Sequence, residues 1–195
     1  MNLMYNNKKT IEEIEKLIEI EKKENLNLEF LEEYKGLLMC GDNFKIMSTM
    51  LEQYENKIDL IYIDPPFNTN TKFFYNKDRV STISIEKNSE LAYSDDMDFE
   101  DYLEFIRERL ILIHKLLSPN GTLYFHIDLK VGHYIKILLD EIFGNDNYVN
   151  DITRIKSNPK NFSRKAYGLD FILVISYMFI QRKKDKTYLM ILKFP

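Results

Sequence analysis

The residues whose types and order point most directly to chemistry are Asp64, Pro65, Pro66 and Phe67, which follow an apolar run at residues 60–63. Such a run is typical of a buried parallel strand. Prolines cannot donate ladder hydrogen bonds, so pairing must stop after Asp64 and the chain continues as a stiff, extended turn. Asp64 is therefore expected at the carboxyl edge of a sheet, where open α/β folds place their ligands. Phe67 follows on a rigid backbone that suits a ring stacking on something flat.

Short apolar runs alternate with amphipathic helical patterns on both sides of this turn. Strands are predicted at residues 37–40, 59–63 and 122–127. Helices with one apolar face are predicted at residues 44–54, 101–117 and 130–143, and a turn at residues 118–121. We expect the three strands to be parallel neighbours in one sheet, with helices packed on its faces and right-handed crossovers between them.

Two further stretches flank or interrupt this pattern. Thr10 and Glu13 form a capping-box pattern that opens a charged helix ending near Lys23. A short helical piece is expected at residues 28–34. Residues 69–97 are polar and irregular, too long for a simple connection, and we expect them to form a lid beside Asp64.

The histidines and the single cysteine show no metal-ligand spacing. His114 falls on a helix face, and His133 lies in the next helix. His126 stands at the end of the third strand, where it either lines the pocket of Asp64 or is a structural histidine held by local hydrogen bonds. Cys40 alone cannot complete a zinc site, so no metal is expected.

Composition bounds the class of protein. A chain of 195 residues with 45% hydrophobic residues can bury a core and form one domain plus appendages. One cysteine excludes a disulfide scaffold. No signal peptide or apolar stretch of membrane-spanning length appears, so we expect a cytoplasmic protein with no membrane partner.

Charge is divided unevenly along the chain. Residues 151–195 carry a net charge of +7, against −11 for the first 150 residues. The basic part either contacts a polyanion or forms a solvated loop. The candidate contact residues are Arg154, Lys156, Lys160, Arg164 and Lys165.

The Asp64 to Phe67 string resembles the signature of the amino-methyltransferases of DNA, in which Asp, Asn or Ser precedes two prolines and an aromatic residue. A base inside a duplex is unreachable, so these enzymes flip it into a pocket. The resemblance implies that the Asp64 carboxylate and a carbonyl of Pro65 or Pro66 accept hydrogen bonds from the exocyclic amine. It also implies that the Phe67 ring stacks on the flipped base and that S-adenosylmethionine is the cofactor.

A Gly-Asp pair at Gly41 and Asp42 resembles the place where the family contacts the adenine of S-adenosylmethionine. This makes Asp42 and Asp64 candidates for cofactor binding. The alternative role of Asp42 is to cap the N-terminus of the helix that comes after it.

The early position of the catalytic string resembles the β-class enzymes, which include the modification (Mod) subunits of type III restriction-modification systems. The resemblance covers about residues 36–175. It implies an α/β, Rossmann-like S-adenosylmethionine-dependent fold, methylation of adenine in double-stranded DNA, and a homodimer working with a restriction subunit. Asp before the prolines favours adenine over cytosine. Cytosine remains an alternative, as does a non-catalytic DNA- or partner-binding remnant of the fold.

The chain departs from the family in its glycines and at its end. All six glycines are isolated, so the Phe-x-Gly-x-Gly cofactor loop is not present. We therefore expect an incomplete fold with an uncovered sheet edge, and weak cofactor binding by these residues alone. Residues 176–195 do not resemble the family and are interpreted as the product of a frameshift or premature stop, or alternatively as a divergent β-hairpin. The expected divisions are a helical extension (1–35), a catalytic region (36–175) and this tail.

Overall fold

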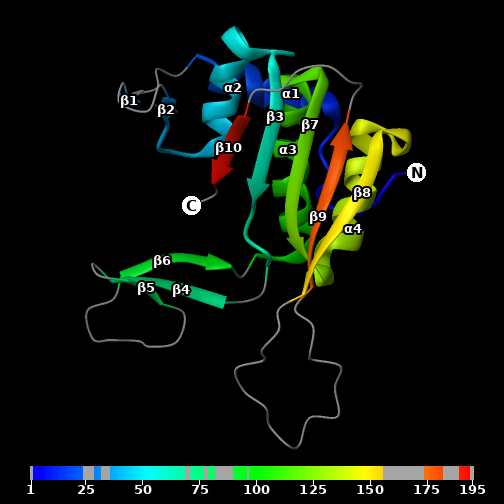
Figure 1. The fold of residues 1–195 in the computed structure, drawn as a ribbon. Coiled ribbons are helices and arrows are strands. Elements are labelled where there is room, and N and C mark those ends of the chain that lie inside the picture. The colour runs from blue at the N-terminus through cyan, green and yellow to red at the C-terminus, as the bar shows by residue number, and fades with distance from the viewer. Residues whose placement is uncertain are drawn as a thin grey trace, which may run out of the picture.

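A computed structural model describes residues 2–23, 29–31, 36–68, 71–76, 79–81, 90–95, 97–155, 174–181 and 189–193 (Figure 1). The helices are α1 (Ile11–Glu21), α2 (Asn43–Tyr54), α3 (Phe99–Leu116), α4 (Leu129–Phe143) and the 3-10 helix η2 (Asn145–Asn147). The strands are β1 (Glu29–Leu31), β2 (Gly36–Leu38), β3 (Ile58–Asp64), β4 (Thr71–Asn76), β5 (Arg79–Ser81), β6 (Glu90–Asp95), β7 (Leu117–Asp128), β8 (Tyr148–Ile155), β9 (Val174–Gln181) and β10 (Leu189–Lys193).

The four α-helices begin and end close to their predicted positions, because their signals are local. At α1 the capping box is formed: the Glu13 amide donates to the Thr10 hydroxyl at 3.2 Å, and the Thr10 amide donates to the Glu13 carboxylate at 2.7 Å. Helix α4 ends at Gly144, whose φ of +86° is a conformation that favours glycine.

The central sheet has five strands in the order β10-β3-β7-β9-β8. Strand β3 pairs in parallel with β7, as predicted, and in parallel with β10 on its other side. The prediction that residues 37–40 neighbour β3 is wrong, because β2 pairs antiparallel with β1 in a separate two-stranded sheet. A local pairing closes a short loop at small entropic cost, which favours this hairpin over a crossover to β3.

Strands β9 and β10 correct the expectations about the tail. Strand β9 lies between β7 and β8 and is antiparallel to both, whereas β10 covers the edge of β3. Strand β10 is an end strand of this sheet, so the expected uncovered edge is moved from β3 to β10 and stays a prediction. The alternative of a β-hairpin for residues 176–195 is wrong, since β9 and β10 are separated in the sheet by two other strands. The sheet therefore contains three parallel strands, β10, β3 and β7, followed by the antiparallel pair β9 and β8. With helices between strands in the sequence, this is the predicted α/β class in a partial Rossmann-like arrangement.

Two regions expected to lack strands contain them. Residues 71–76, 79–81 and 90–95 form a three-stranded antiparallel sheet, with β4 between β5 and β6. Residues 29–31 are a strand and not part of a helix. Three consecutive aromatic residues in β4, Phe73, Phe74 and Tyr75, have high β-strand propensity, a signal that outweighs the irregular composition around them.

The predicted turn at residues 118–121 is a distortion within β7. The register shifts between Ile58 and Leu60, so that Leu117 pairs with Ile58 and Thr122 with Leu60. A Cβ atom on Gly121 would lie 2.8 Å from the carbonyl oxygen of Ile58 and 2.7 Å from the Leu117 side chain. Glycine is required here because the backbone of β3 approaches too closely for any side chain.

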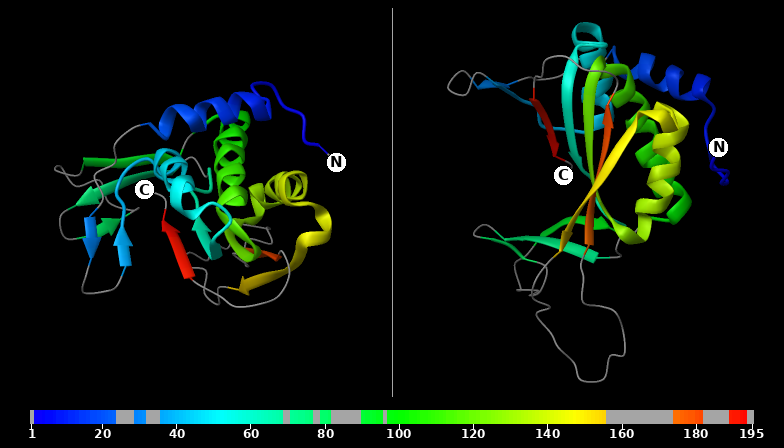
Figure 2. Two further views of the ribbon diagram at one scale, coloured as in Figure 1. Left: turned by 90° about the horizontal axis from the view of Figure 1, so that it is seen from above. Right: turned by 45° about the vertical axis from the view of Figure 1, so that its right-hand side comes forward.

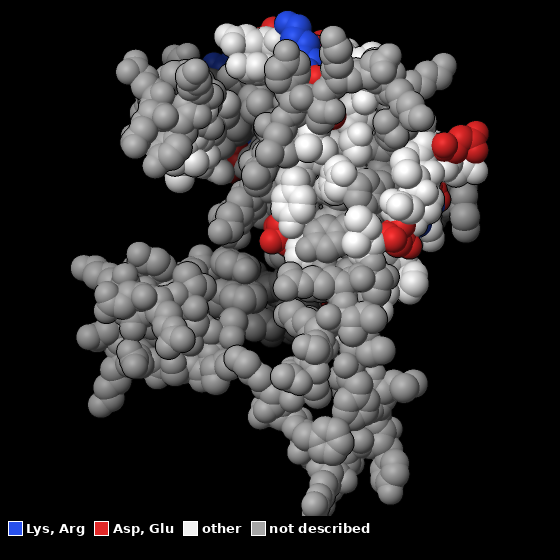
Figure 3. All heavy atoms as spheres, viewed as in Figure 1, with Lys and Arg blue, Asp and Glu red and all other residues white. Residues whose placement is uncertain are grey.

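Helices α3 and α4 cover one face of the central sheet (Figure 2). The core between them and the strands includes Ile61 and Ile63 of β3, Phe125 of β7, Leu110 of α3 and Leu138 of α4, each no more than 1% exposed. The other sheet face is the one viewed in Figure 3, where the described side chains are mainly neutral. Among the described residues, no helix has the length and apolar character needed to cross a membrane.

The segment before α1 is tied to α3 and α4 by a polar cluster. The Tyr5 hydroxyl donates to Glu104 at 2.5 Å, the buried guanidinium of Arg107 donates to Glu104 at 3.1 Å, and Lys8 pairs with Glu141 at 2.7 Å. Burial, and then the Glu104 carboxylate, raise the pKa of the Tyr5 hydroxyl. These buried charges are paired and hydrogen-bonded, which buried charges require.

Candidate active site

Asp64 is the last residue of β3, at the carboxyl end of the three parallel strands. Its side chain is 41% exposed, whereas Ile63, the residue before it, is 1% exposed. Strand pairing ends here because Pro65 and Pro66 come next and have no N–H group. The carboxylate therefore stands where the sheet ends and solvent begins, at the edge that the sequence predicted.

The turn after Asp64 is held from α3. Tyr102 is buried, with 1% of the residue exposed, and its hydroxyl donates a hydrogen bond to the carbonyl of Pro66 at 2.7 Å. Asn68 then takes a φ of +52°, a left-handed conformation that asparagine tolerates better than most residues. The φ angles of both prolines are fixed, and the Tyr102 hydroxyl holds the Pro66 carbonyl, so the turn has little conformational freedom.

Phe67 is partly buried and packs against the core. Its ring meets the ring of His126 edge-to-face, with centroids 5.2 Å apart and planes at 85°. The ring is thus oriented by a contact and not left free on the surface, as aromatic pairs in this geometry attract each other.

His126 lies on β7, directly beside the end of β3. Its Nδ1 atom is 2.6 Å from Oδ1 of Asp64, and its side chain is 13% exposed. The β3–β7 register pairs Ile63 with Phe125, so the next residue on each strand falls at the same edge. Sequence placed His126 at this edge and left its role open; the structure brings it into contact with both Asp64 and Phe67.

Asp42 caps α2, as one of its two predicted roles required. Its Oδ1 accepts hydrogen bonds from the amides of Phe44 at 2.9 Å and Lys45 at 3.2 Å. Its Oδ2 faces the Nη2 of Arg109 at 3.3 Å, and half of the side chain remains exposed. Gly41, immediately before it, has a φ of +152°.

Arg109 is a residue that sequence reasoning missed. Its buried guanidinium lies over the Phe105 ring, 3.6 Å from the centroid, and donates to Asn43 at 2.6 Å and to the Phe105 carbonyl at 3.0 Å. Burial lowers the pKa of Arg109, and the Asp42 carboxylate opposes that shift. The available signal was helical spacing, which puts Arg109 on the same predicted apolar face as Phe105 and Ile106, and an arginine must be paired when it is buried.

Helix α3 therefore contacts both candidate segments along one face. Tyr102 reaches Pro66, and Arg109, seven residues further along, reaches Asp42. Two turns of helix span about 10 Å, so the Asp42 turn attaches to α3 at roughly that distance from the proline turn.

The remaining predicted residues lie mostly outside the described part of the chain. Of the basic candidates, Arg154 falls in β8, and Lys156, Lys160, Arg164 and Lys165 lie outside the described residues. The predicted lid is described only as β4, β5 and β6.

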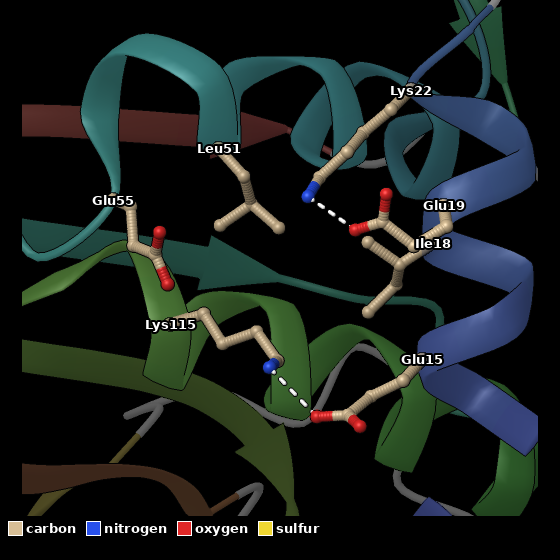
Figure 4. Close-up of a pocket in the computed structure, with 7 residues that line it drawn as sticks. All are labelled: Glu15, Ile18, Glu19, Lys22, Leu51, Glu55 and Lys115. Atoms are coloured by element: carbon tan, nitrogen blue, oxygen red, sulfur yellow. Dashed lines mark hydrogen bonds and ion pairs between the residues drawn. The ribbon is translucent and has the colours of Figure 1, made fainter. Parts of the chain in front are cut away.

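A pocket lies elsewhere, between α1, α2 and the end of α3 (Figure 4). It is lined by Glu15, Ile18, Glu19, Lys22, Leu51, Glu55 and Lys115. Ion pairs join Lys115 to Glu15 at 3.0 Å and Lys22 to Glu19 at 2.5 Å across its rim. Ile18 and Leu51 form its apolar side, so it marks the seam where α1 packs on the domain.

Comparison with known proteins gives a consistent result. Residues 58–193 match the family described as DNA methylase, and the chain belongs to that family. The chain is similar to the type II methyltransferase M.EcaI of Enterobacter cloacae, with 38% identity over 122 residues, covering 62% of this chain and 25% of that protein. It is 34% identical over 153 residues to the type III restriction-modification enzyme EcoP15I Mod subunit of Escherichia coli, covering 71% and 23%.

The chain thus spans about a quarter of the length of these two relatives. Among solved structures it is similar to that of an M1.HpyAVI-SAM complex, with a TM-score of 0.41 and 20% identity, over 80% of this chain and 64% of the other.

Proposed function

We propose that this chain forms the part of a DNA methyltransferase that binds the target amine. The methyltransferase belongs to a restriction-modification system and transfers a methyl group from S-adenosylmethionine to the exocyclic amine of adenine. The observation that carries the proposal is the exposed Asp64 carboxylate at the carboxyl edge of the sheet, followed by the proline turn and the oriented Phe67 ring. A flipped base needs both an acceptor for its amine and an aromatic face.

Asp64 has the chemistry to bind the amine. Its carboxylate accepts a hydrogen bond from the amine N–H and draws electron density toward nitrogen, which favours nucleophilic attack by the nitrogen. When bound, S-adenosylmethionine supplies an electrophilic methyl group on a positively charged sulfur. The proton that the amine loses is then passed from the exposed carboxylate to solvent.

The second acceptor is assigned to Pro65. The carbonyl of Pro66 already accepts the hydrogen bond of Tyr102 at 2.7 Å, so the carbonyl of Pro65 is the better partner for the second amine hydrogen. Phe67 lies two residues beyond Pro65, where its ring can stack on the base. Stacking on an aromatic side chain contributes about 1–3 kcal/mol per base.

Asp42 is proposed to contact the adenosine end of the cofactor. Its side chain is half exposed beside Gly41, and the turn is fixed to α3 by Arg109. A carboxylate in this position suits an exocyclic amine or a ribose hydroxyl. The methionine end requires close backbone approach, and the isolated glycines of this sequence do not supply a glycine-rich turn for it.

The partners follow from the same proposal. Double-stranded DNA is the substrate, contacted by the basic residues within 151–195 through its phosphates. Similarity to a Mod subunit of a restriction-modification enzyme supports association with a restriction subunit, and a homodimer is proposed in addition.

Product analysis tests the proposal. The full-length protein carrying these residues is incubated with unmethylated DNA and methyl-labelled S-adenosylmethionine, and the labelled nucleosides are separated. We expect N6-methyladenine, no product from Asp64→Ala, and unchanged DNA affinity for that variant because, of the proposed contacts to DNA, it removes only the bond to the reacting amine. If the labelled nucleoside is N4-methylcytosine, the target base is cytosine and not adenine. Methylation retained by Asp64→Ala would reject the acceptor site itself.

A further inference from the structure

A single side chain, His126, contacts both the acid and the ring of the proposed amine site. Its Nδ1 lies 2.6 Å from Oδ1 of Asp64, and its ring meets that of Phe67 at 5.2 Å. It comes from a different strand, β7, and is mostly buried, with 13% of its side chain exposed. A side chain anchored in a neighbouring strand can hold a carboxylate more firmly than solvent does.

The 2.6 Å distance between Nδ1 and Oδ1 is short enough for an N–H donor on the imidazole, but the angle at Nδ1 lies outside hydrogen-bond geometry, so the bond requires a rotation of one of the two side chains. An imidazole nitrogen that donates to a carboxylate fixes both the tautomer and the ring orientation. The carboxylate is fixed in return, because the terminal torsion of aspartate is otherwise broad. With Oδ1 held by His126, Oδ2 is the oxygen that remains for the substrate amine.

We propose that His126 is a positioning residue, which turns the Asp64 carboxylate so that Oδ2 receives the amine and keeps the Phe67 ring at the stacking angle. This inference rests on the proposed function of Asp64 and Phe67. Misplacement of a catalytic group by about 1 Å can cost about 100-fold in rate. Loss of the imidazole should therefore lower kcat more than it raises KM for DNA.

Two substitutions separate the two contacts. His126→Phe keeps a ring beside Phe67 and removes the donor to Asp64, and His126→Asn puts an amide N–H close to the position of Nδ1 and removes the ring. We expect about a 100-fold loss of kcat for His126→Phe, and recovery of most of that loss in His126→Asn.

His114→Asn is the matched control. His114 also makes an edge-to-face contact, with Phe143 at 5.1 Å, but it lies toward the carboxyl end of α3. It is twelve residues from Tyr102, or about 18 Å along the helix. Its kcat should match that of the unaltered protein. Thermal unfolding of each variant shows whether the protein is folded at the assay temperature.

Proton NMR of the 195-residue chain gives a readout that does not depend on turnover. An imidazole N–H proton bonded to a carboxylate exchanges slowly and resonates at low field. We expect one such resonance to be lost in both His126→Phe and Asp64→Ala and retained in His114→Asn. Its persistence in Asp64→Ala, or its absence from the unaltered chain, would overturn the inference, as would a fully active, folded His126→Phe variant.

The two proposals fail in different ways. Methylation by Asp64→Ala would reject the proposed function even with the resonance present. Loss of methylation in Asp64→Ala together with full activity in His126→Phe would leave the function standing and reject the positioning role.

Discussion

The two ends of β3 carry the same side chain in similar surroundings and differ in the backbone next to it. Near the amino end, Asp59 accepts a hydrogen bond from the hydroxyl of Ser118 at 2.6 Å. At the carboxyl end, Asp64 lies 2.6 Å from His126. Both partners come from β7. A short contact to a neighbouring strand therefore does not distinguish a structural carboxylate from a functional one.

The strand pairing around each acid separates the two. Near Asp59 the strands are so close that Gly121 has no room for a Cβ atom, and the pairing continues. After Asp64 the prolines stop the pairing, and the carboxylate is 41% exposed at the edge where α/β folds bind ligands. The amino end of β3 is closely packed against β7, whereas the carboxyl end leaves the Asp64 carboxylate accessible to a ligand.

The largest effect on stability should come from filling the closed end. Gly121→Ala places a methyl group against the Ile58 carbonyl and should lower the free energy of unfolding by about 3 kcal/mol. Urea denaturation measures this. Asn120→Ala, at an exposed neighbouring position, is the control and should change stability by less than about 0.5 kcal/mol. Equal stability of the two variants would show that this end is not tightly packed.

At the open end, Phe67→Ala should affect activity more than folding. Loss of stacking on the flipped base should lower kcat/KM by about 30-fold, or about 2 kcal/mol. The ring is only partly buried, so its loss from the core should cost less than removal of a fully buried phenylalanine. Phe67→Tyr is expected to keep the activity. A Phe67→Ala enzyme with unchanged kcat/KM would contradict the stacking role.

Tyr102→Phe tests the support behind the open end. It removes the hydrogen bond to the Pro66 carbonyl and keeps the buried ring, so stability should fall by about 1 kcal/mol. Tyr124→Phe, on β7, is the comparison for loss of a hydroxyl from a partly buried strand position. If Tyr102→Phe is as stable as the parent, the proline turn is held by its own torsions alone.

The smallest effect on stability is expected for two aspartates that cap helices, Asp42 and Asp98. Asp42→Asn keeps the cap of α2 and loses the ion pair with Arg109, and should cost about 0.5 kcal/mol at low salt. Asp98→Asn keeps the cap of α3, where the structure shows no such ion pair among the described residues, and should cost nothing measurable. The difference between the two variants should shrink in 1 M salt, which screens exposed charges beyond about 3 Å.

The contrast between predicted and missed features reflects the range of the signals. The helices, the Thr10 cap and the end of β3 at Asp64 were predicted because periodicity, caps and prolines act within a few residues. The pairing of β10 with β3 was missed because it joins residues far apart in sequence. The contact of Arg109 with Asp42 was missed for the same reason, and the position of His126 at the Asp64 edge was predicted while its role was left open, since each contact depends on which element lies beside it.

Of the two ends of β3, only the carboxyl end is expected to do chemistry, and Asp59→Ala and Asp64→Ala, measured side by side, decide this. For Asp59→Ala we expect a loss of about 1–3 kcal/mol in stability, because the buried Ser118 hydroxyl loses its partner, with near-normal methylation per folded molecule. For Asp64→Ala we expect a stability change below about 1 kcal/mol and at least about a 1,000-fold loss of methyl transfer. Similar activity losses in the two variants, or methylation retained by Asp64→Ala, would contradict this division of roles.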